Sequence, residues 1–308
     1  MDLNLSTFYF SLLTLMLIII LGFILGKIGL ISPSTNKQLV NLLLMVFMPA
    51  ALFNAFPADF SEESAGIFFA GLAAGFIIML VMIVVSKILF HRRFYKGELS
   101  FEAQFAFIFN NATFLGYPLI STAFGEQGVL PYCGFIVAFN LALFSYGIYL
   151  FEKKITTRFF KEVATNPNII AVLLGMVLFF LSIHLPDPVT SAVGYVASAT
   201  TPLSLICIGY MLSRAHLRDL LRRWKLLIIA SLQLILAPLL AYFLLSFMHF
   251  PQEVVVVCSL LQALPTATSL GLFAEKYGGN DVESSELVII STLLSCATLP
   301  LMVLMIFQ

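Results

Sequence analysis

The sequence predicts an all-α polytopic membrane protein with ten transmembrane helices. Of its 308 residues, 60% are hydrophobic and only 10% are charged, whereas a typical soluble domain carries about 25% charged residues. The apolar residues gather in ten continuous runs, each near the roughly 20 residues that one helix needs to cross a bilayer. A water-soluble fold of this size could not bury so much apolar surface. The composition therefore excludes a soluble enzyme, a nucleic-acid-binding protein and a disordered chain.

The ten runs follow one another with short connections. In chain order they cover residues 7–26, 37–56, 64–90, 101–124, 128–151, 168–184, 189–213, 225–249, 254–274 and 285–307. None shows the alternation of a membrane β-barrel strand, and in lipid the backbone must satisfy its own hydrogen bonds, so helices are expected. The first run has no basic residue before it and no evident cleavage site, which favours a retained span over a signal peptide.

The charged residues divide cleanly between the two sides of a ten-span chain. All sixteen Lys and Arg residues fall on one side, and most of them lie in the connections around 91–97, 152–167 and 214–225. The other side carries acidic residues and no Lys or Arg: Asp2, Asp59, Glu62, Glu63, Glu126, Asp187 and Glu253. Cytoplasmic loops of membrane proteins are enriched in Lys and Arg. We therefore expect a plasma-membrane protein with both termini outside.

The connection 152–167 divides the chain into two halves, 1–151 and 168–308, with five spans each. Because five is odd, the second half enters the membrane from the opposite face, so repeated halves would be inverted repeats. Pro49 and Pro202 occupy matching spans, as do Pro118 and Pro265. Proline is common in transmembrane helices, and Pro238 and Pro300 have no counterpart, so unrelated kinks are the alternative explanation.

The fourth and ninth spans are polar and rich in helix breakers at their centres. The fourth contains Asn110, Asn111, Thr113, Gly116 and Pro118, and the ninth contains Gln262, Pro265 and Thr266. Irregular backbone at this depth is tolerated only beside protein or a water-filled cavity. Interrupted helices at matching positions of inverted halves mark transporter binding sites, and exposed helix N-termini there attract anions. The alternative is a pair of ordinary kinks packed through small residues.

The membrane interior contains no charged side chain in the middle of any predicted span. Intramembrane carboxylates are typical of proton relays and cation coupling, so an exchanger with paired aspartates is not expected. An anion held by amides, hydroxyls and helix ends fits this pattern. No catalytic or nucleotide-binding motif and no paired cysteines are present, so we expect no enzyme, cofactor or metal site.

At these residues the sequence resembles the auxin efflux carrier family, which includes bacterial organic-acid permeases. The fourth span matches the family pattern Asn-x-x-x-x-Gly-x-Pro with Asn111, Gly116 and Pro118, and the segments 166–170, 264–279 and 291–301 match further family regions. The resemblance implies a five-plus-five inverted repeat in which spans four and nine break and cross. It also implies a scaffold of spans one, two, six and seven, transport spans three to five and eight to ten, and pairing of two copies through the scaffold.

Together these observations predict a bacterial secondary active transporter of a small organic anion, working by alternating access. The expected substrate-binding residues are Asn111, Asn110, Thr113, Asn140, Gln262 and Thr266, and the expected crossover residues are Gly116, Pro118 and Pro265. An anion channel or a ligand-binding membrane receptor could use the same mid-membrane site and is the alternative. The expected partners are the anion and the lipid bilayer, with no nucleic acid.

Overall fold

The computed structural model describes residues 5–56, 61–90, 100–152, 161, 164–214, 223–277 and 279–306. Within these residues the protein is helical throughout, and its only extended pairing is one isolated bridge between two residues. Most of the predicted connection 152–167 lies outside the described residues. The all-helical class predicted from the sequence is confirmed for the part of the chain that is described.

The first half of the chain contains both long and interrupted helices. In order they are α1 (Leu5–Lys27), α2 (Pro33–Leu42), η1 (Leu43–Phe47), α3 (Met48–Phe53), α4 (Glu62–Leu89), α5 (Ser100–Ile108), η2 (Ala112–Gly116), α6 (Tyr117–Ala142), η3 (Leu143–Gly147) and α7 (Ile148–Glu152). The three η segments are π-helical turns. Such turns occur mostly as single insertions within α-helices, often near functional positions.

The second half has the same mixture. Its helices are α9 (Pro167–Phe180), α10 (Asp187–Ser198), α11 (Thr200–Ser213), α13 (Trp224–Phe247), α14 (Gln252–Gln262), α15 (Ser269–Tyr277) and α16 (Asp281–Ile306). Pro238 and Pro300 lie inside α13 and α16 without ending either helix. A proline in an apolar run therefore does not by itself mark a break in this protein.

Six helical stretches are long and apolar enough to cross a membrane: Pro33–Phe53, Glu62–Leu89, Gln127–Glu152, Asp187–Ser213, Trp224–Phe247 and Val282–Ile306. They coincide with the predicted spans two, three, five, seven, eight and ten. Shorter apolar helices, Leu13–Lys27, Pro167–Phe180 and Gln252–Gln262, lie within spans one, six and nine. The structure thus shows a multi-pass membrane protein, and the count of ten spans stays a prediction.

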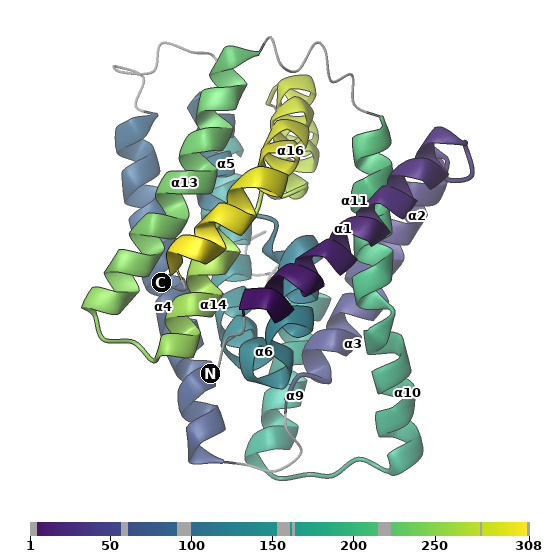
Figure 1. Ribbon diagram of the computed structural model, residues 1–308. Helices are drawn as coiled ribbons and strands as arrows, with labels where there is room; N and C mark the ends of the chain where they lie inside the picture. Colours follow the sequence, from purple (N-terminus) through teal and green to yellow (C-terminus); the bar gives the residue numbers. More distant parts are fainter. Residues whose placement is uncertain are drawn as a thin grey trace.

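The helix ends that carry basic residues gather at one end of the molecule (Figure 1). Lys87 lies in the last turn of α4, while Arg214 follows α11 and Arg223 precedes α13, all toward the top of the view. The helices α4 and α10, whose first turns are acidic, begin at the bottom of the view, and α14, which also has an acidic first turn, begins higher. Acidic residues also occur at the basic end, where Glu283 lies 3.2 Å from Arg223.

The helices pack in pairs that correspond between the two halves. In the first set, α1 runs along α11 and α3 lies against α9. In the second set, α4 packs on α6, and α13 packs on both α14 and α16 (Figure 1). In terms of the predicted spans, span one contacts span seven, and span two contacts span six. Likewise, span three contacts span five, and span eight contacts span ten.

Large apolar side chains remain exposed along the outer helices. They include Leu13 and Leu17 of α1, Leu80 of α4 and Leu174 of α9, each more than 40% exposed. Such continuous apolar exposure is unsuited to water. It is what a helix surface facing lipid requires.

Gly125 turns the chain between the second half of span four and span five. Its φ of 58° and ψ of −146° interrupt the helical geometry of α6, and a Cβ placed there would meet no atom within 4 Å. Because only the backbone conformation disfavours a side chain, we expect Gly125→Ala to lower the free energy of unfolding by about 1–2 kcal/mol. Thermal unfolding in detergent measures this. Gly66→Ala is the control, since Gly66 is helical and equally unobstructed; equal stability of the two variants would contradict the prediction.

Candidate functional site

The fourth span is interrupted between Ile108 and Ala112. The helix α5 ends at Ile108, and η2 begins only after an irregular segment of three residues. The Asn111 side chain caps the new segment, because its Oδ1 accepts a hydrogen bond from the Phe114 amide at 3.3 Å. Pro118 follows the π-helical turn η2 as the second residue of α6 and has no N–H group to donate to the preceding turn. The sequence therefore ends one half-helix and starts another within the span.

The ninth span is interrupted in the same way. The helix α14 ends at Gln262 and α15 begins at Ser269, with Pro265 in the segment between them. The Thr266 amide donates to Ser291 Oγ of α16 at 3.1 Å, which satisfies one of the backbone groups that the break leaves free. The ninth span breaks around Pro265, whereas the fourth span breaks at residues 109–111, before Gly116 and Pro118, at which the sequence predicted its break; these two residues lie in η2 and α6.

The two irregular segments cross and pair with each other. The Asn111 amide donates to the Pro265 carbonyl at 2.7 Å, and the Ala267 amide donates to the Phe109 carbonyl at 2.9 Å. Asn110 and Thr266 form an isolated antiparallel bridge between these two bonds. We call residues 109–111 and 265–267 the crossover. Each broken helix thus supplies the hydrogen-bond partners that the other lost.

The pairing geometry separates the side chains of the crossover into two faces. Asn110 and Thr266 are opposite each other in a non-hydrogen-bonded pair, so their side chains lie close together on one face. Both are at most 1% exposed, and the Asn110 amide and the Thr266 hydroxyl have no hydrogen-bond partner. Successive side chains of an extended segment alternate. Asn111 is therefore expected on the face opposite Asn110, although the two residues are adjacent.

The turn that follows Asn111 lies where the two sets of packed helices meet. The turn η2 that follows Asn111 packs against α6 and α14 and also against α11. Thr113 in this turn is half-buried. The capping bond occupies the Asn111 Oδ1 and does not use its Nδ2 group. Asn111 and Thr113 thus place an amide and a hydroxyl at this boundary.

More buried polar groups surround the crossover on the side of α13 and α14. The Gln262 Nε2 atom and the Ser259 hydroxyl have no hydrogen-bond partner. The Gln233 amide donates to the Leu264 carbonyl at 2.6 Å. A buried polar atom without a partner costs free energy comparable to a lost hydrogen bond. A concentration of such atoms at one place is therefore a candidate ligand site.

The structure uses the other predicted residues differently. Asn140 donates its amide to the Ile136 carbonyl one turn earlier in α6, so that group serves its own helix. Gly116 is buried, and a Cβ there would lie 2.9 Å from Leu261 of α14, so its role is close packing beneath the crossover.

Two contributors to the crossover were missed from the sequence. Gln233 and Ser291 lie within predicted spans eight and ten and bond directly to the broken ninth span. The signal that could have found them is an uncharged polar residue in the middle of an apolar run. That signal is weak, because serine in a transmembrane helix usually bonds to its own backbone.

The partial charges at the crossover come from the ends of helices and not from charged side chains. The helices α5 and α14 end there with free carbonyl groups, and η2 and α15 begin there with free N–H groups. Among the described residues, no group of three or more His, Cys, Asp or Glu side chains could hold a metal ion. The buried Glu102 lies at the start of α5, where its Oε1 accepts from the Asn280 amide at 3.0 Å.

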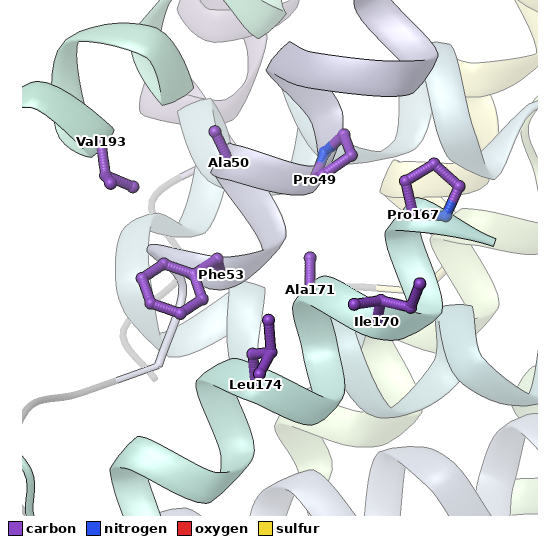
Figure 2. A pocket seen from close by; sticks show the side chains of 8 residues that line it. All are labelled: Pro49, Ala50, Phe53, Pro167, Ile170, Ala171, Leu174 and Val193. Atoms are coloured by element: carbon purple, nitrogen blue, oxygen red, sulfur yellow. The ribbon is translucent and has the colours of Figure 1, made fainter. Parts of the chain in front are cut away.

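A surface groove of about 350 Å³ lies away from the crossover, between α3, α9 and α10. Figure 2 shows Pro49, Ala50 and Phe53 of α3 facing Ile170 and the neighbouring side chains of α9. The side chains that line the groove are apolar. These side chains can contact hydrocarbon chains, but they provide no hydrogen-bond donor for an anion.

Comparison with known proteins agrees with the architecture and the crossover. The family model described as a membrane transport protein matches residues 7–160 and 153–303, which is nearly the whole chain. The chain belongs to the auxin efflux carrier family. The resemblance drawn from the fourth and ninth spans is thereby confirmed.

Two relatives of this family member align over most of their length. A protein of Rhizobium meliloti named "Putative malonate transporter" is 24% identical over 291 residues, covering 91% of this chain and 90% of the relative. A protein of Methanothermobacter thermautotrophicus named "Uncharacterized transporter" is 24% identical over 305 residues, covering 94% of this chain and 96% of the relative. Membership of a transporter family supports the expectation that the chain is not an enzyme.

Proposed function

We propose that this family member is a secondary active transporter of a small organic carboxylate, with its binding site at the crossover. The observation that carries the proposal is the paired break itself. Two interrupted helices meet at buried, uncharged polar groups, several of which have no partner. Transporters commonly bind anionic substrates at half-helix N-termini near the middle of the membrane.

In the proposed site, Asn111 is the main contact for the carboxylate. Its Nδ2 group and the Thr113 hydroxyl donate from the Asn111 face, and the N-terminal amides of η2 add a positive helix end. Asn110 and Thr266 on the opposite face, with Gln262, bind the rest of the substrate or its hydration shell. Asn140 lies in the next span and is a weaker candidate, because its amide is already engaged.

The proposed mechanism is alternating access by a ten-span, five-plus-five inverted repeat. The scaffold consists of α1, α2–α3, α9 and α10–α11, and the moving part contains the remaining helices. Support comes from the paired contacts of the two halves and from η2, which lies against α11 where the two parts meet. Two copies would pair through the apolar scaffold, in the plasma membrane, with both termini outside.

Counterflow in proteoliposomes tests the proposal. Purified protein is reconstituted with internal malonate, chosen because a relative is named a malonate transporter, and uptake of external labelled malonate is measured. A carrier shows uptake stimulated by the internal substrate, whereas a channel shows uptake without stimulation and a receptor shows binding without uptake. A panel of mono- and dicarboxylates follows if malonate is inactive. Failure of every acid to bind or cross would contradict the proposal.

A further inference from the structure

The side chain of Gln233 reaches the crossover from a helix outside the broken pair. It lies on α13 and is 1% exposed. Its Nε2 atom is 2.6 Å from the Leu264 carbonyl oxygen and 3.5 Å from that of Gln262. An amide in the interior of a membrane protein is costly unless it is bonded. The Gln262 carbonyl ends α14, and the Leu264 carbonyl lies two residues after it. The Gln233 amide therefore donates only to this region of the chain.

This bond fixes the peptide that positions Asn111. Leu264 directly precedes Pro265, and the Pro265 carbonyl accepts the Asn111 amide at 2.7 Å. Displacement of the Leu264 carbonyl would therefore move the acceptor of the Asn111 amide. Pro265 has no N–H group with which to anchor the segment itself. The position of Asn111 thus depends on a contact from α13 through one intervening residue.

The same bond changes the electrostatics of the site. The carbonyl groups of Ser259, Leu260 and Leu261 accept hydrogen bonds from the Ala263 and Leu264 amides, whereas those of Gln262 and Leu264 face the Gln233 side chain at the negative end of α14. Unscreened carbonyl oxygens beside the crossover would repel a carboxylate. Donation by Gln233 Nε2 engages the Leu264 carbonyl, two residues after the end of α14, at 2.6 Å, and the same atom lies 3.5 Å from the Gln262 carbonyl.

We propose that Gln233 is a positioning residue for substrate binding: it holds the end of α14, and through Pro265 the Asn111 donor, and it screens the carbonyl groups there from the anion. The part of this inference that concerns substrate binding rests on the proposed function. The positioning step concerns the protein alone.

The first experiment needs no substrate. Hydrogen exchange of the segments around Asn111 and Ala267 is compared in the wild type, Gln233→Leu and Leu234→Ala. Leu234 is the matched control, because it is fully buried on the same helix and has no bond to the crossover. We expect exchange at the crossover to accelerate about tenfold in Gln233→Leu and to stay within about twofold in Leu234→Ala. Equal protection in wild type and Gln233→Leu overturns the positioning role, whatever the protein transports.

The second experiment separates positioning from general loss of stability. With malonate, or the best acid of the panel, Gln233→Leu is expected to raise KM about tenfold and to leave the maximal rate within about twofold. Leu234→Ala should lower thermal stability without changing KM. An unchanged KM for Gln233→Leu overturns the inference while leaving the proposed function intact.

A pH profile of Gln233→Glu tests the screening. A protonated carboxyl group can donate to the Leu264 carbonyl as the amide does, whereas a carboxylate repels both that oxygen and the substrate. The KM of this variant relative to wild type is therefore expected to rise about tenfold between pH 5.5 and pH 8.5. A ratio that does not change with pH overturns the screening role. If no acid binds the wild type, the proposed function fails, and the exchange experiment alone decides whether Gln233 positions the crossover.

Discussion

Replacement of Asn111 by Asp is expected to abolish carboxylate transport while the protein stays folded. An aspartate at this position keeps the oxygen that accepts the Phe114 amide at 3.3 Å, so the cap of η2 survives. It loses the Nδ2 donor and places a negative charge at the proposed carboxylate-binding site. We expect the affinity for the anion to fall about a hundredfold or more, because a buried like charge faces the ligand.

The measurement is counterflow together with thermal unfolding of the same preparation. Asn111→Ala is the matched comparison, since it removes both the donor and the cap and should lower stability by about 1 kcal/mol more than Asn111→Asp. A folded Asn111→Asp protein that transports at the wild-type rate would show that the carboxylate does not bind Asn111. Loss of folding in Asn111→Asp would instead show that the residue is chiefly structural.

Replacement of Gly209 by Ala is expected to have the largest effect on stability. Gly209 of α11 faces α1, and a Cβ there would lie only 2.0 Å from the Ile19 carbonyl oxygen and 2.7 Å from the Phe23 amide nitrogen. The obstructing atoms are backbone, so the two helices would have to separate. Gly22 on α1 is obstructed in the same way by Ile206 of α11. Overpacking of this kind costs about 1–3 kcal/mol and occasionally more.

The measurement is thermal unfolding in detergent, where we expect the Tm of Gly209→Ala to fall by about 5 °C or more. Gly194→Ala is the control, because Gly194 is helical and its Cβ would meet no atom within 4 Å. That variant should be unchanged or slightly stabilised, since Ala favours the helix over Gly. A Gly209→Ala protein as stable as Gly194→Ala would contradict the close approach of α1 and α11.

Much of the fold could be predicted because the determining signals are local. An apolar run long enough to cross the bilayer forms a helix wherever it lies, and a cluster of Asn, Gly and Pro weakens the helix that contains it. The sequence alone therefore located the long apolar helices and the polar stretches in which the fourth and ninth predicted spans are interrupted. It could not decide which prolines break a helix, since Pro238 and Pro300 lie in equally apolar runs.

The candidate site was predicted less completely than the fold. Asn110 and Asn111 are identical in type and adjacent in sequence, so only the extended pairing with residues 265–267 assigns them to opposite faces. Asn140 looked equivalent to the other asparagines until the structure showed its amide bonded to Ile136. Gln233 carried no distinguishing pattern, because its partners are backbone carbonyl groups 29 and 31 residues away.

The sequence by itself determined that this chain is a helical membrane protein with polar interruptions in two spans, because hydrophobicity and backbone breaking are properties of short segments. The tertiary structure decided what the interruptions do. A break inside a membrane is stable only if the freed backbone groups find partners, and those of Asn111 and Ala267 find them in the other broken span. Which polar groups remain unpaired after that exchange, and so remain available to a substrate, depends on contacts between distant helices.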